Sequence, residues 1–139
     1  MQTTTDHVEG RVPVTVLRLE GDLDASNFEA VIDEGKQLYE AGARDLLVDL
    51  RAVPYMGSSG LVALHSLALI FNGLEPPDPE SGWAAHHALE AAVDSGLQPH
   101  LKVLLPAAPD SAPGRVMQRT GLDRFIDCRT DEAEAIAAF

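Results

Sequence analysis

The sequence predicts an α/β fold in a single domain, residues 1–139, with a mixed or largely parallel sheet of four or five strands packed against about four helices. Three observations lead to this prediction. The chain has 139 residues, which suits one domain of ordinary size. It is 45% hydrophobic but only 5% aromatic, so aliphatic side chains must build the core. Apolar runs alternate with segments of helical period, an order that implies parallel strands joined by crossovers.

The first strand is expected in "VTVLRLEG", Val14 to Gly21, which is rich in β-branched and aliphatic residues and stops at glycine. A helix should follow and end near Gly42. Gly35, inside it, costs about 1 kcal/mol relative to alanine. The candidates for its N-cap are Asp24, Ser26 and Asn27.

The next strand and helix are expected on either side of Pro54. "LLVDLRAV", residues 46–53, is an almost continuous apolar run, which is typical of a central strand covered on both faces. Pro54 ends this strand because it lacks an N–H. "SSGLVALHSLALIF", residues 58–71, predicts a helix whose apolar residues nearly encircle it, so we expect it to be well buried.

Residues 72–100 form an insert longer than a typical connection. It begins with a glycine and three prolines, which favour a stiff, extended loop. A short helix capped by Ser81 should follow and end near Gly96. Trp83, the single tryptophan, lies in this insert and is expected to anchor it to the domain.

The remainder of the chain predicts strand, helix, strand and helix. "LKVLLP", residues 101–106, is expected to be a strand. Ser111 as cap and Gly121 as stop predict a short helix with Pro113 in its first turn. "RFIDCR", residues 124–129, should be the last strand, and Thr130 should cap the last helix.

The charge balance narrows the choice of partners. There are 22 acidic and 10 basic residues, a formal net charge of −12, which disfavours nucleic acids and anionic membranes. Such a charge serves solubility, or it steers the chain toward a basic protein. No signal pattern and no apolar run of about 20 residues is present, so we expect a cytoplasmic protein.

Ser58 and Ser59 lie where an apolar strand meets a helix, the place where ligands gather in α/β sheets. Either serine could cap the helix, and Ser58 could also accept a phosphate, which a helix N-terminus favours. A catalytic serine is disfavoured, because the G-x-S-x-G pattern around Ser59 would require glycine where Leu61 stands.

No cofactor and no metal site is expected. His65, His86, His87 and His100 lack ligand spacing, so we expect them to be solvated. No nucleotide-binding motif is present. Cys128 cannot form an intrachain disulfide, because it is the single cysteine, and it should be an inert thiol in a strand. Asp22 and Asp24 are expected to shape the turn before a helix, or to accept hydrogen bonds from a partner's arginine or lysine.

Four pieces in this order and spacing resemble the STAS domain of bacterial anti-sigma-factor antagonists. They are "LRLEGDLDASN", "LLVDLRAVPYMGSSGLVAL", "LKVLLPA" and "RTGLDRFI". The resemblance implies a mixed sheet packed against helices and no enzymatic activity. It implies that the unmodified protein binds an anti-sigma factor, often a GHKL-type serine kinase, and so frees a sigma factor. Phosphorylation by the kinase ends binding, and a phosphatase restores it.

Carried over by motif, the phosphorylated serine falls on Ser58, with Ser59 less favoured. The implied partner-binding surface is Asp22, Asp24, Met56, Gly57, Ser58, Ser59, Gly60 and Leu61. Two features depart from the family. Gly57 stands where an aspartate usually precedes the serine, and the 72–100 insert replaces a short turn. The insert could form a homodimer or contact a partner.

Two other functions remain open. Gly57 and the insert favour a STAS-type interaction scaffold without phosphorylation, within a signalling complex. A small enzyme using Ser58 or Ser59 with a histidine of the insert is the third hypothesis.

Overall fold

The computed structural model describes residues 1–73, 99–108 and 110–139. The expected helix in the insert, with Ser81, Trp83, His86 and His87, lies outside these residues. The elements are β1 (Gln2–Glu9), β2 (Pro13–Glu20), α1 (Phe28–Glu40), β3 (Leu46–Ala52), α2 (Ser58–Phe71), β4 (Leu101–Leu104), α4 (Ala112–Thr120), the 3-10 helix η2 (Leu122–Arg124), β5 (Asp127–Arg129) and α5 (Glu132–Ala137).

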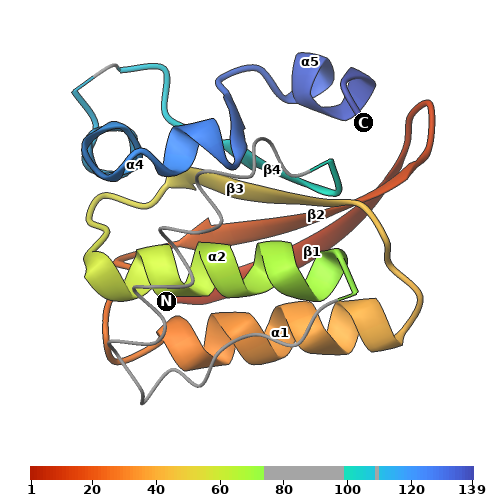
Figure 1. The fold of residues 1–139 in the computed structure, drawn as a ribbon, viewed down its shortest axis with the longest axis horizontal. Helices are drawn as coiled ribbons and strands as arrows, with labels where there is room; N and C mark the ends of the chain where they lie inside the picture. Colours follow the sequence, from red (N-terminus) through yellow and green to blue (C-terminus); the bar gives the residue numbers. More distant parts are fainter. Residues whose placement is uncertain (74–98, 109) are drawn as a thin grey trace.

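One sheet organises the molecule (Figure 1). Its five strands lie in the order β1-β2-β3-β4-β5. β1 pairs antiparallel with β2, and the other neighbours are parallel. The α/β class and the mixed, largely parallel sheet are therefore confirmed.

Strand β1 was not predicted from the sequence. It is a polar segment, QTTTDHVE, and most of its side chains are exposed. Its place comes from a hairpin, in which Val8 pairs with Val14 and the Gly10 N–H donates to the Val12 carbonyl at 3.1 Å. Val8 packs against the core, but one apolar residue leaves no alternating pattern to read.

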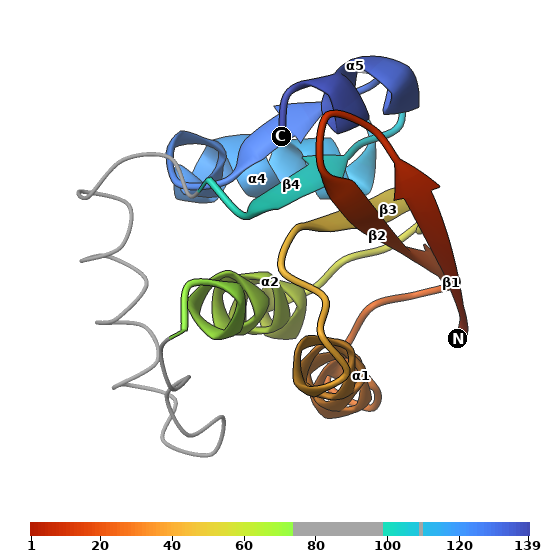
Figure 2. The same ribbon diagram turned by 90° about the vertical axis from the view of Figure 1, so that its right-hand side faces the viewer.

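Helices cover both faces of the sheet (Figure 2). α1 and α2 lie side by side on one face, over a core that includes Leu17, Val48 and Leu64. α5 lies on the other face, over a smaller core that includes Val16, Leu47 and Ala135. This arrangement confirms that β3 is a central strand: its first five residues, 46–50, are all buried.

The two helices of the first layer approach closely at Gly35. A Cβ atom at this position would lie 2.0 Å from Cδ2 of Leu67 in α2. Gly35 is buried, so the glycine that weakens α1 locally is the residue that allows α1 to pack against α2.

An ion-pair network attaches α5 to the opposite face. Arg18 of β2 donates to Asp49 of β3 at 2.9 Å and to Glu132 of α5 at 2.6 Å. Arg51 of β3 donates to the same two carboxylates, each at 3.0 Å. Burial alone would raise the pKa of Asp49, but the hydrogen bonds from Arg51 and Arg18 outweigh it, and the pKa is lowered.

The predicted caps of α4 agree with the structure, and the predicted N-cap of α5 does not. Ser111 accepts a hydrogen bond from the Gly114 N–H, and Gly121 ends α4 with a φ of 76°, both as predicted. The prediction of Thr130 as cap of the last helix is wrong. Asp131 is the N-cap of α5, and its carboxylate accepts the Glu134 N–H at 2.9 Å.

The last strand is shorter than predicted. β5 begins at Asp127, and the residues before it include η2 and the buried Phe125 and Ile126. Apolar burial at a helical turn produces the same short hydrophobic run as a strand. Among the described residues, no helix has both the length and the hydropathy to span a membrane.

Gly35→Ala should lower the free energy of unfolding by about 1–3 kcal/mol, the usual cost of overpacking, although alanine is the better helix former. Urea denaturation measures this change. Gln37→Ala, on the exposed face of the same helix, is the matched control and should be neutral or slightly stabilising. A stabilised Gly35→Ala variant would contradict the packing described.

Asp49→Asn should reduce stability at pH 7 and flatten its dependence on pH. The folded-state pKa of Asp49 is lowered, so its contribution is present above the unfolded pKa of about 3.9 and is lost as the pH falls through the folded value. Denaturation curves between about pH 7 and pH 2 should therefore converge for the two proteins in acid. The exposed Asp33→Asn is the control, and curves that stay parallel would oppose this role for Asp49.

Candidate functional site

The candidate site is built where two loops meet at one end of the sheet. These are the β2–α1 loop, residues 21–27, and the β3–α2 loop, residues 53–57. An isolated parallel bridge pairs Leu23 with Met56. In it the Leu23 N–H donates to the Tyr55 carbonyl at 2.9 Å, and the Gly57 N–H donates to the Leu23 carbonyl at 3.0 Å. The pairing of β2 with β3 thus resumes beyond the strands and brings the two loops together.

The side chains of the bridge face inward. Leu23 and Met56 are buried, at 0% and 2% exposure. Their neighbours in sequence point the other way, because direction alternates in extended chain. Asp22 is exposed and Asp24 is partly exposed, beside the start of α2.

Asp24 is held by the turn before α1. Its Oδ1 accepts hydrogen bonds from the Ser26 hydroxyl at 2.6 Å and the Ser26 N–H at 2.9 Å. These bonds lower the pKa of Asp24, so the carboxylate is ionised at neutral pH. Asn27 completes the turn: its Oδ1 accepts from the Asp24 N–H, and its Nδ2 donates to the Asp22 carbonyl at 2.7 Å. Asn27 is the N-cap residue of α1, without a side-chain cap bond.

Ser58 is the first residue of α2 and not its cap. The N-cap is Gly57, in extended conformation, which contradicts the expectation that a serine caps this helix. Ser58 is exposed and Ser59 is partly buried. Neither hydroxyl makes a hydrogen bond to any residue that the structure describes. The helix therefore leaves its first N–H groups without side-chain partners, next to an accessible hydroxyl.

The predicted binding residues divide into an exposed and a buried set. Asp22 and Ser58 are exposed, whereas Met56, Gly60 and Leu61 are buried beneath them. Gly60 has a packing reason: a Cβ there would lie 2.5 Å from Cγ of Met56 and 3.1 Å from Cδ2 of Leu23. Only the outer residues can touch a partner, and the inner ones hold them in place.

Tyr55 is a neighbour of the site that the sequence did not single out. Its side chain is 53% exposed, and its ring lies over Gly57. A Cβ at position 57 would lie 3.3 Å from the Tyr55 hydroxyl, closer than an ordinary contact. The signal in the sequence was an aromatic residue directly after Pro54, in a loop.

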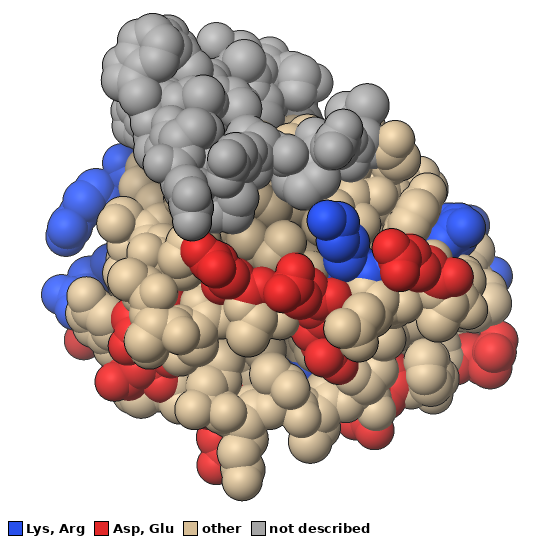
Figure 3. Space-filling model, turned by 90° about the horizontal axis from the view of Figure 1, so that it is seen from below, with Lys and Arg blue, Asp and Glu red and all other residues tan. Residues whose placement is uncertain are grey.

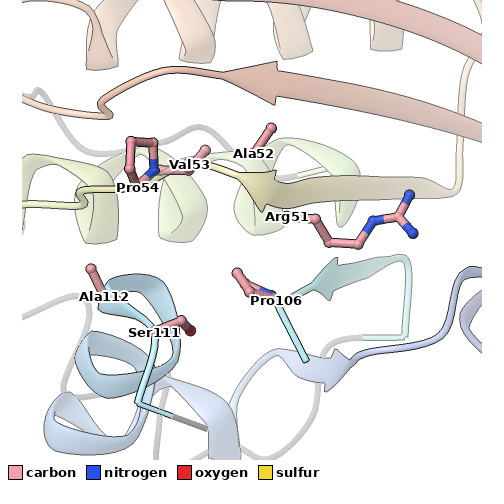
Figure 4. A pocket seen from close by; sticks show the side chains of 7 residues that line it. All are labelled: Arg51, Ala52, Val53, Pro54, Pro106, Ser111 and Ala112. Atoms are coloured by element: carbon pink, nitrogen blue, oxygen red, sulfur yellow. The ribbon is translucent and has the colours of Figure 1, made fainter. Parts of the chain in front are cut away.

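A pocket of about 420 Å³ lies beside the end of β3 and the start of α4 (Figure 4). Arg51 and Ser111 are the polar side chains that line it. Arg51 is directed away from Ser111 and Ala112 and pairs with Asp49 and Glu132. The Ser111 hydroxyl is occupied as a helix cap. Both groups thus serve the fold, and Ser58 does not line this pocket.

Two other reactive side chains, His65 and Cys128, are buried and partly buried respectively. His65 is 2% exposed in α2, so the expectation that it is solvated is wrong. Its ring lies 5.7 Å from that of Phe125, and burial lowers its pKa, which keeps it neutral. Cys128 lies in β5 as expected, and burial raises the pKa of its thiol to about 12. Among the described residues, no three histidine, cysteine or carboxylate side chains could hold a metal ion.

Comparison with known proteins supports the resemblance. The model of the STAS domain family matches residues 5–71. No curated protein sequence matches the chain at a significant level. One similar structure is an anti-sigma factor antagonist from Mycobacterium paratuberculosis, with a TM-score of 0.69, 20% identity, and coverage of 99% of this chain and 92% of that one. Another is the anti-sigma factor antagonist SpoIIAA in its unphosphorylated form, with a TM-score of 0.49, 17% identity, and coverage of 97% and 94%.

Ser58→Ala should leave stability unchanged within about 0.5 kcal/mol, because the hydroxyl neither caps α2 nor bonds to any residue in the described part of the chain. Ser111→Ala is the matched comparison and should cost about 1 kcal/mol, since Ser111 does cap its helix. Thermal or urea denaturation distinguishes the two. A loss of about 1 kcal/mol for Ser58→Ala would mean that its side chain does cap α2.

Proposed function

From the STAS domain match and the fold of this chain, we propose that it is an antagonist of an anti-sigma factor. In this role it is a regulatory protein and not an enzyme. Its unmodified form binds an anti-sigma factor that is itself a GHKL-type serine kinase, and so releases a sigma factor for transcription. The kinase then phosphorylates Ser58, which separates the complex, and a phosphatase restores the binding form.

The observation that carries this proposal is the state of Ser58. Its hydroxyl is exposed, makes no hydrogen bond to the described residues, and stands at the first position of α2. A kinase can therefore reach it without unfolding the helix. The N–H groups of the first helical turn and the helix dipole favour an attached phosphate.

The mechanism is electrostatic. Phosphorylation adds about −1.5 to −2 charges at the centre of the docking surface. Asp24 is already ionised there, and Asp22 is exposed nearby. Burying this added charge against a partner without a matching arginine costs several kcal/mol, which is enough to separate a complex.

Three further expectations follow from this role. We propose that residues 1–139 form one STAS-like domain, with the insert at 72–100, and that it acts in the cytoplasm with its partners. A homodimer formed through the insert stays a prediction, because nearly all of the insert lies outside the described residues.

The kinase reaction tests the switch. The protein is incubated with the purified anti-sigma kinases of its source organism and ATP, and the phosphate is located by mass spectrometry. We expect one phosphate on Ser58, lost in Ser58→Ala and retained in the matched control Ser59→Ala. Ser58→Asp should weaken binding of the kinase about 100-fold or more, or ~3 kcal/mol.

The outcomes separate the competing functions. If a kinase binds the protein without phosphorylating it, and binds Ser58→Asp with the same affinity, the interaction scaffold is favoured. Gly57, in place of the aspartate usual in the family, is the reason for considering that alternative. Labelling of Ser58 or Ser59 by a fluorophosphonate would favour the enzyme, and we expect none.

A further inference from the structure

The exposed Tyr55 side chain makes no hydrogen bond or ring-ring contact with the residues that the structure describes. Tyr55 and Met1 are the two large hydrophobic side chains that are exposed in the described part of the chain, at 53% and 44%. Tyr55 lies two residues before Gly57, the N-cap of α2, and three residues before Ser58. An apolar ring at this place would be covered if a partner docks over Ser58.

Tyr55 is held in place rather than free. Its carbonyl accepts the Leu23 N–H at 2.9 Å, which fixes its backbone to the neighbouring loop. Its ring rests over Gly57, with Cε1 3.6 Å and the hydroxyl 3.3 Å from where a Cβ would lie. A side chain at position 57 would displace the Tyr55 hydroxyl by a few tenths of an ångström. A ring already ordered loses little conformational entropy when it is buried by a partner.

Of the two chain segments that form the site, the β2–α1 loop contributes carboxylates, and the basic residue nearest to Tyr55 in sequence, Arg51, pairs with Asp49 and Glu132. Residues 20–34, which include the β2–α1 loop and the first half of α1, contain six carboxylates and no lysine or arginine. Residues 52–73, which include the β3–α2 loop and α2, contain no lysine or arginine either. Glu29 and Asp33 of α1 are exposed, and Figure 3 shows acidic side chains over the face that includes α1, with Lys and Arg side chains at several places among them. A protein partner that covers the exposed Asp22 and the ionised Asp24 is expected to place lysine or arginine opposite them.

We propose that Tyr55 is the anchor through which this surface docks a basic protein: its ring enters an apolar pocket of the partner, and the carboxylates around it pair with lysine or arginine at the rim. The partner is the anti-sigma kinase, so this inference rests on the proposed function. An aromatic anchor within a polar rim is the arrangement in which a few residues carry most of the binding energy. Gly57 contributes by leaving room for the ring.

Binding of the purified anti-sigma kinases of the source organism, measured by titration calorimetry with the full chain, tests the anchor. Tyr55→Ala should weaken binding at least about tenfold, whereas Tyr55→Phe, which keeps the ring, should stay within about threefold of wild type. Affinity for the wild type should also fall as salt rises, since the rim pairs are screened. Tyr55→Ala removes an exposed side chain and should fold normally, which circular dichroism verifies.

Gln118→Ala, on the exposed face of α4, is the control and should bind as wild type does. If a kinase binds wild type and Tyr55→Ala equally well, the anchor is wrong while the proposed function stands. If the two tyrosine variants lose affinity equally, the hydroxyl and not the ring makes the contact, and the anchor is again wrong. If no kinase binds wild type, the proposed function fails and the anchor fails with it.

Discussion

The parallel pairing of β2 with β3 is the constraint on which the candidate site depends. It does not stop at the ends of the strands, because Leu23 and Met56 pair once more beyond them. That single bridge joins two loops that are separated in sequence by α1 and β3, and its two apolar side chains are buried. The exposed neighbours, Asp22 on one loop and Ser58 after the other, are thereby carried to the same surface. Loops tied by a backbone bridge present such groups with little freedom, which favours binding without a large entropic cost.

The sheet is stabilised differently on its two faces, and the difference explains where function can lie. Under α1 and α2 the contact is apolar and close, down to the missing side chain of Gly35. Under α5 the contact with the sheet has two parts: a small apolar core and the ion-pair network of Arg18, Asp49, Arg51 and Glu132. These four charged side chains are paired with one another and hold α5 on the sheet. At the end of the α1–α2 layer Asp22 of the β2–α1 loop is exposed and Asp24 is partly exposed, so this end offers carboxylates close to Ser58.

Periodicity and turn chemistry predicted most of this fold. The sequence shows directly those features that belong to a single segment. Examples are the continuous apolar run of β3, the apolar residues all round α2, and the N-cap and C-cap of α4. The features that the sequence did not predict, strand β1 and the burial of His65, depend on tertiary contacts. β1 is polar and pairs with the edge of β2, and His65 is buried where α2 packs against Phe125. The caps at Ser58 and Thr130 were one residue away from the true positions, since cap choice depends on backbone angles that several small polar residues can adopt. For the candidate site, Ser58 and Asp24 were predicted together by resemblance, whereas the contact of Tyr55 with Gly57 required coordinates.

The place of Ser58 one residue inside the helix determines what kind of switch it can be. If Ser58 were the cap, a phosphate would remove a hydrogen bond that α2 needs, and modification would loosen the fold near the core. Gly57 is the N-cap residue instead, and the Ser58 hydroxyl has no bond to lose within the described structure. A phosphate there gains the N–H groups of the first turn while it adds charge to a surface that already carries Asp22 and Asp24. In the proposed switch, the folded domain would tolerate a phosphate on Ser58 and a docked partner would be repelled by it. A switch at this position acts on association, and the fold that positions it stays the same in both states.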